Sequence, residues 1–319
     1  MSVTTDPVPS PPTFSAIVPN YNDTSTIGET LATLANQTTP LHEIIVVDDG
    51  STDGSGGTLA AIVAATPRAR LICLPDNRGV VAALNIGLSE AAGEFVLLCS
   101  ANDRYDTRLV EHCRRLLARH PSLGAISGKA AVWNAARQEA GAVLKPVSAS
   151  PTAFSTADLV RACRRSPAIL APGYAIRRDK AIALGGLDPA LRWHSDWFLF
   201  SAIAFTSGYG FVPETFATIT IGAGARYSDG RLDWSRERPV LRALLQRLGE
   251  VPAAADGCRQ GALLPCYDLR AIGLLRDPDL PRMLTPLLVW RMLIHSVSYW
   301  WKDRVPRSVV LRFRGWLRA

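Results

Sequence analysis

A short apolar run that ends in two adjacent carboxylates constrains the fold more than any other feature of the chain. Four consecutive aliphatic residues, 44–47, lead directly to Asp48 and Asp49, and the turn residues 50–53 follow. A β-branched run bounded by turn residues predicts a strand buried on both faces, as in a parallel sheet. Ligands of open α/β sheets bind just beyond the carboxyl ends of such strands. Adjacent acids there cost desolvation energy unless polar or cationic groups meet them, so we expect a binding site.

Strands and helices alternate through the first hundred residues. The composition predicts strands at 14–19, 44–47, 69–74 and 94–99, and helices at 25–35, 59–65 and 80–92. This alternation predicts an α/β fold with a doubly wound, mostly parallel sheet. A polar cluster follows each strand, and all four clusters should lie along one edge of the sheet: 20–23, 48–53, 76–78 and 100–103.

The composition and the missing motifs exclude several classes of protein. The 319 residues are 48% hydrophobic and 20% charged, which is typical of a soluble globular protein. Six cysteines are scattered without a close pair, and the N-terminus lacks a signal pattern, so we expect a cytoplasmic protein with reduced thiols. A P-loop, an intact dinucleotide fingerprint and a cysteine–histidine metal motif are all missing. The polar clusters instead suit a phosphorylated ligand bound through Mg²⁺ or Mn²⁺.

The motifs occur in an order that resembles the family 2 glycosyltransferases, which have the GT-A fold. The resemblance rests on residues 16–22, 45–53, 77–87 and 93–96, and on the later segments 184–188 and 195–197. It extends from about Phe14 to Pro213. We interpret 1–12 as a disordered leader, 13–125 as a nucleotide-sugar-binding half, 126–232 as an acceptor and catalytic half, and 233–319 as a helical basic region.

The resemblance also implies roles for individual residues. Asp196 matches the general base of the inverting members, which takes the proton of the acceptor hydroxyl. Arg78 matches a basic residue near the pyrophosphate of the donor. The remaining donor-side residues are Pro19, Tyr21, Asp48, Asp49, Asn85 and Asn102. Trp193 and Trp197 are interpreted either as acceptor-binding aromatics or as core residues.

The metal motif departs from the family pattern. Members of the family usually carry Asp-x-Asp-Asp where this chain has Ser100-Ala101-Asn102-Asp103. Asp103 is therefore the predicted ligand of Mg²⁺ or Mn²⁺, assisted by the phosphates of the donor. Little metal dependence and a disabled enzyme are the alternatives.

The net charge of +7 comes from the C-terminal end. Residues 281–319 contain eight basic residues and one acid, which account for the whole excess. Arg291 interrupts the apolar run 283–295, so this run is not expected to span a bilayer. Beyond Pro306, apolar and basic residues alternate as in an interfacial amphipathic helix, which favours contact with the inner face of the cell membrane. Packing on its own domain or on a second copy of the chain is the alternative, and no nucleic-acid partner is expected.

The sequence thus predicts an inverting transferase that moves a sugar from a nucleotide-diphosphate donor to a saccharide or lipid-linked acceptor. Two alternatives stay open: a non-catalytic sugar-nucleotide binder, suggested by the altered metal motif, and a nucleotidyltransferase of similar fold.

Overall fold

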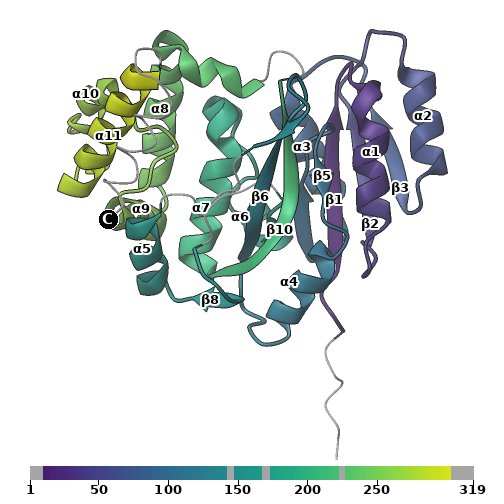
Figure 1. The fold of residues 1–319 in the computed structure, drawn as a ribbon, viewed down its shortest axis with the longest axis horizontal. Coiled ribbons are helices and arrows are strands. Elements are labelled where there is room, and N and C mark those ends of the chain that lie inside the picture. The colour runs from purple at the N-terminus through teal and green to yellow at the C-terminus, as the bar shows by residue number, and fades with distance from the viewer. Residues whose placement is uncertain (1–9, 142–146, 167–172, 223–226, 303–319) are drawn as a thin grey trace, which may run out of the picture.

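The protein is built on one mixed sheet covered by helices on both faces (Figure 1). A computed structural model describes residues 10–141, 147–166, 173–222 and 227–302. The sheet has ten strands, eight of them in the order β3-β2-β1-β4-β9-β6-β10-β5. Strand β7 adds to β6 and strand β8 adds to β10 at its margins.

The first half contains every strand and helix that the sequence predicts there. Strand β1 pairs in parallel with β2 and with β4, and β2 pairs in parallel with β3. The elements are β1 (Phe14–Asn20), α1 (Thr24–Ala35), β2 (Glu43–Asp48), α2 (Gly56–Ala65), β3 (Ala69–Cys73), α3 (Val80–Glu90) and β4 (Phe95–Leu98). The doubly wound α/β class is confirmed.

The second half continues the same sheet instead of forming a separate one. Strand β9 is antiparallel to both β4 and β6, and β6 is parallel to the long strand β10. The elements are β5 (Arg104–Tyr105), α4 (Leu109–Leu117), β6 (Ala125–Asn134), β7 (Glu139–Ala140), β8 (Thr152–Phe154), α5 (Thr156–Arg165), β9 (Ala175–Arg177), α6 (Arg178–Ala183), η1 (Pro189–His194), α7 (Ser195–Ser207) and β10 (Tyr209–Ile221).

Helices dominate the remainder of the chain and lie beyond α7, away from β1 and β2 (Figure 1). They are η2 (Tyr227–Leu232), α8 (Trp234–Gly249), α9 (Pro252–Gly261), η3 (Leu269–Ala271), α10 (Ile272–Leu275) and α11 (Pro286–Lys302). Within residues 10–302, gaps aside, no helix is long and apolar enough to cross a membrane. The leader residues 1–9 and the basic segment 303–319 lie outside the described residues, so neither prediction about them is tested.

The hydrophobic core consists of two clusters, one on each face of the sheet, because successive side chains along a strand point to opposite faces. Ile17, Ile45 and Val47 face α3 and α7 in one cluster, while Val18 and Val46 face α1, α2 and α4 in the other. Both faces of the central strands are therefore buried, which explains why residues 44–47 form an unbroken apolar run.

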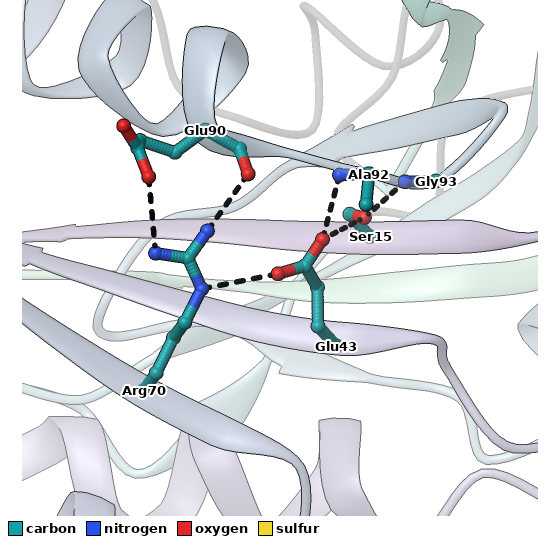
Figure 2. A network of polar contacts seen from close by, with 6 residues as sticks. All are labelled: Ser15, Glu43, Arg70, Glu90, Ala92 and Gly93. Carbon is teal, nitrogen blue, oxygen red and sulfur yellow. Dashed lines mark hydrogen bonds and ion pairs between the residues drawn. The ribbon is translucent and has the colours of Figure 1, made fainter.

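A polar network ties the strands together at the end of the sheet where β1 and β2 begin (Figure 2). Glu43 accepts hydrogen bonds from the Ala92 N–H at 2.7 Å and from the Ser15 hydroxyl at 2.9 Å. Arg70 pairs with Glu43 at 3.1 Å and reaches the Glu90 carbonyl at 2.7 Å. Burial alone would raise the pKa of Glu43, but these bonds outweigh burial and lower it. The network fixes where α3 ends and β4 begins.

Candidate functional site

A cavity of about 710 Å³ opens at the carboxyl ends of β1 and β4. Strand β1 is followed on one side by β2 and β3, and on the other by β4, so the cavity lies at the switch point of the sheet, where α/β proteins bind ligands. Its volume is within the usual range for small-molecule sites. The residues that line it and enter the argument below are Pro19, Tyr21, Asp23, Asn102, Asp103, Tyr174, Arg192, Trp193, Asp196 and Thr220.

Asp48 and Asp49 are buried at the end of β2 and organise the neighbouring loops. The Asp48 carboxylate accepts hydrogen bonds from the Asn20 amide at 2.9 Å and from the Ser51 hydroxyl at 2.6 Å. The two oxygens of Asp49 accept the N–H groups of Arg78 and Gly79, each at 2.8 Å. The desolvation cost of the acid pair is therefore met by the protein itself. Neither residue lines the cavity, so their predicted contact with the donor stays a prediction.

Gly50 allows the Asp76–Gly79 loop to come this close to the end of β2. Its φ of +67° is unfavourable for residues with a side chain, and a Cβ there would lie 2.6 Å from the carbonyl carbon of Asp76. The Asp49 carboxylate thus occupies N–H donors at the start of α3 that an anion could otherwise use.

Two more of the predicted donor-side residues, Arg78 and Asn85, do not line the cavity either. Arg78 is exposed, and its backbone N–H is bound to Asp49. The Asn85 amide bonds the backbone of Leu187 in both directions, accepting from its N–H and donating to its carbonyl, each at 2.8 Å. Asn85 therefore joins α3 to the loop before η1, and its contact with a donor, like that of Arg78, stays a prediction.

The residues after β4 form a poor cation site. Asp103 is buried, and its Oδ1 accepts the N–H of Thr220 at 3.0 Å. Asn102 adds a neutral amide to the cavity wall. Nowhere in the described part of the chain do three or more His, Cys, Asp or Glu residues gather closely enough to hold a metal ion. With one carboxylate, whose Oδ1 already accepts a hydrogen bond, the residues after β4 do not by themselves fit a resident divalent cation, and the predicted Mg²⁺ or Mn²⁺, assisted by the phosphates of the donor, stays a prediction.

Asp196 faces the cavity from the first turn of α7. Burial raises the pKa of its carboxyl group, although the Trp197 N–H, bound at 2.7 Å, and the nearby His194 oppose the shift. The buried Tyr174 lies on the same cavity wall, and burial together with the charge of Asp196 raises its pKa. An aspartate with a raised pKa is a better proton acceptor near neutral pH than an ordinary one.

The two tryptophans beside Asp196 have different positions. Trp197 is buried in the core and does not line the cavity, so the structure places it as a packing residue. Trp193 lines the cavity, and its indole N–H donates to Glu237 at 2.7 Å. The other oxygen of Glu237 lies 2.7 Å from His194 Nε2. Sequence reasoning missed Glu237, because nothing in the polar start of α8 distinguishes it from its exposed neighbours.

Arg192 and Tyr174 line the cavity and were also missed by sequence reasoning. Arg192 is exposed toward the cavity, with φ of 43° and ψ of −117°, and it interrupts η1 just before Asp196. Its position beside Trp193 and four residues before Asp196 was the one available signal in the sequence.

Comparisons with known proteins identify the class to which this fold and site belong. The sequence profile of Glycosyl transferase family 2 matches residues 15–181, slightly more than half of the chain. The chain therefore belongs to glycosyl transferase family 2, as the order of its motifs predicted.

Similar proteins include a bacterial glycosyltransferase and a bacterial succinoglycan biosynthesis protein. Glycosyltransferase GlyG of Streptococcus pneumoniae is 34% identical over 31% of this chain and 33% of its own. Succinoglycan biosynthesis protein ExoO of Rhizobium meliloti is 33% identical over 36% of this chain and 31% of its own. The chain thus spans about a third of the length of these relatives.

Solved structures show the same fold. S. aureus TarS 1-349 in complex with UDP superimposes with a TM-score of 0.61 at 19% identity, covering 78% of this chain and 70% of that one. Its complex with UDP-GlcNAc gives a TM-score of 0.58 at the same identity, with 78% and 80% coverage. The GT-A-type fold is confirmed.

Proposed function

We propose that the protein is an inverting glycosyltransferase in which Asp196 is the general base. The observation that carries the proposal is the position of Asp196, a carboxylate with a raised pKa on the wall of a cavity at the switch point of the sheet. Asp196 takes the proton of an acceptor hydroxyl while that oxygen attacks the anomeric carbon. The bond from this carbon to the diphosphate breaks in the same displacement, so the configuration inverts.

The nature of the substrates is supported by the relatives. TarS has been crystallised with UDP and with UDP-GlcNAc, which supports a nucleotide-diphosphate sugar as the donor. The names of ExoO and of the poly-β-1,6-N-acetyl-D-glucosamine synthase of Staphylococcus epidermidis support a part in polysaccharide biosynthesis. The saccharide or lipid-linked acceptor belongs to the proposal. Membership of family 2 disfavours the nucleotidyltransferase alternative.

Replacing the base tests the proposal. In Asp196→Asn the amide can still accept the Trp197 N–H but cannot take a proton, so transfer should fall about 10²-fold or more. Release of nucleoside diphosphate from a panel of nucleotide sugars measures the loss. The wild-type rate should rise with pH as Asp196 ionises and then level off, and this ionisation should occur above the ordinary aspartate pKa of about 3.9 because burial raises it.

Asp188→Asn is the matched control. Asp188 caps η1 by accepting the Ala190 N–H at 2.9 Å and lies outside the cavity wall, and asparagine caps equally well. Full turnover by Asp196→Asn would remove Asp196 from the mechanism. Nucleotide binding with no turnover by the wild type would favour the alternative of a non-catalytic binder.

We further propose that the C-terminal end contacts an anionic membrane surface. Trp290 is 53% exposed and Leu293 is 42% exposed on α11, and both line an apolar groove that also holds Arg276. Partition onto phosphatidylglycerol vesicles should fall in Trp290→Ser/Leu293→Ser and after deletion of residues 307–319. Unchanged partition of both variants would contradict membrane contact.

A further inference from the structure

The cavity has an unfavourable charge for the ligand that family membership implies. Three carboxylates, Asp23, Asp103 and Asp196, line it. A nucleoside diphosphate carries further negative charge into the same space, and the acidic residues that would bind a neutralising metal ion are reduced to Asp103. Some other positive charge must therefore stabilise the diphosphate.

Arg192 supplies the one cationic side chain among the described residues that line this cavity. Within the described part of the chain, its guanidinium has no hydrogen-bond or ion-pair partner, whereas many other arginines here are paired with acids. A guanidinium can bind two phosphate oxygens at once, and it keeps its charge at every physiological pH.

The backbone of Arg192 is held in a conformation that is rare for a residue with a side chain. Its φ of 43° and ψ of −117° lie outside the helical region, which strains the backbone of a residue with a side chain. Contacts on both sides impose this conformation. The fully buried Leu191 precedes it, the Ser195 hydroxyl donates to its carbonyl at 2.8 Å, and His194 is bound to Glu237. Backbone strain of this kind concentrates at ligand-binding and catalytic sites.

We propose that Arg192 binds the diphosphate of the donor and stabilises it as the leaving group, in the place that a metal ion held by acidic residues would otherwise take. The inference rests on the proposed function and adds to it the residue that carries the positive charge. As the bond between the anomeric carbon and the diphosphate breaks, its electron pair passes to the leaving oxygen, and Arg192 balances the charge that develops there. Asp196, four residues later in the chain, removes the proton of the acceptor.

The proposal is tested by asking whether replacement of Arg192 weakens the binding of nucleoside diphosphates but not that of nucleosides. Nucleoside diphosphates and the matching nucleosides are titrated calorimetrically into the full chain in EDTA, and then in Mn²⁺. In EDTA the wild type should bind the diphosphate more tightly than the nucleoside. Arg192→Gly should weaken the diphosphate about 10- to 100-fold and leave the nucleoside unchanged, because only the guanidinium contact is lost. Arg192→Lys, which keeps the charge, should recover part of the loss.

Stability measurements separate this role from a structural one. Glycine adopts positive φ without strain, so Arg192→Gly should melt no lower than the wild type although it binds the diphosphate less well. Arg119→Ala, which removes an exposed arginine just after α4, is the control. It should change neither the melting temperature nor the affinity for the diphosphate.

Several outcomes would overturn the inference. It fails if Arg192→Gly weakens the nucleoside and the diphosphate equally, or if the diphosphate binds only with Mn²⁺ and Arg192→Gly has no effect. It also fails if Arg78→Ala, and not Arg192→Gly, causes the selective loss. In each of these cases the proposed function stands. If the wild type binds no nucleotide in either buffer, the proposed function fails and the inference fails with it.

Discussion

Glu237 connects two residues of the candidate site through one carboxylate. It is fully buried, and its two oxygens bind the Trp193 indole at one side and the His194 imidazole at the other. Trp193 also packs against Gly230, where a Cβ would overlap the indole ring. Because Asp196 follows His194 by two residues, Glu237 determines how the chain enters the first turn of α7 and acts as a positioning residue.

Glu237→Gln should therefore be destabilising. A glutamine oxygen can still accept the Trp193 N–H, but its NH₂ group can bond His194 Nε2 only if the imidazole moves its proton to Nδ1, and both bonds lose the strength that the carboxylate charge gives them. We expect the free energy of unfolding to fall by about 1–3 kcal/mol, measured by urea denaturation. Glu250→Gln, which removes an exposed ion pair with Arg247, should cost well under 1 kcal/mol. Equal effects of the two substitutions would contradict the assigned role.

At the scale of elements, α3 is placed by a close approach to β1. A Cβ at Gly87 would overlap the Cγ2 of Ile17, so the helix lies closer to the strand than an alanine would permit. The start of the same helix contributes Val80, Val81 and Leu84 to the cavity wall. The width of the cavity therefore depends on how closely α3 packs.

A pair of glycine substitutions tests this dependence. Gly87→Ala should lower the free energy of unfolding by about 1–3 kcal/mol, because the added methyl group overpacks the core. Gly28→Ala lies in α1 with open space around its Cβ, so it should stabilise by about 0.5–1 kcal/mol through the higher helix propensity of alanine. Thermal unfolding of both variants measures the difference. A Gly87→Ala protein as stable as the wild type would show that α3 is free to move outward.

At the scale of the whole molecule, the two halves are one structure because β9 pairs with both β4 and β6. Because the sheet is continuous, the loops that follow β1 and β4 lie near η1 and α7. Residues of these loops and Asp196 therefore line the same cavity. The interpreted boundary near residue 125 falls at the start of β6 and separates no independent sheet.

The sequence was sufficient for the class of fold, because residues 44–47 and their counterparts are short β-branched runs bounded by turn residues, which is typical of buried parallel strands. It also identified Asp196 and Asp103 as residues of one site. It could not show that Asp49 is bound to the Arg78–Gly79 backbone, since this contact depends on the turn at Gly50. Sequence reasoning missed Arg192 and Glu237 for a similar reason. Their roles arise from a backbone conformation and from burial, neither of which has a local sequence pattern.

The most direct test of the central claim is a titration of the full chain with the diphosphates of uridine, guanosine, adenosine, cytidine and thymidine. We predict that at least one of them binds and raises the melting temperature, since a ligand at 100 times its Kd stabilises the folded state by about 2.7 kcal/mol. Binding should be competed by the corresponding nucleotide sugar. Failure of all five to bind, with the protein folded, would contradict the assignment of the cavity at the carboxyl ends of β1 and β4 as a donor site.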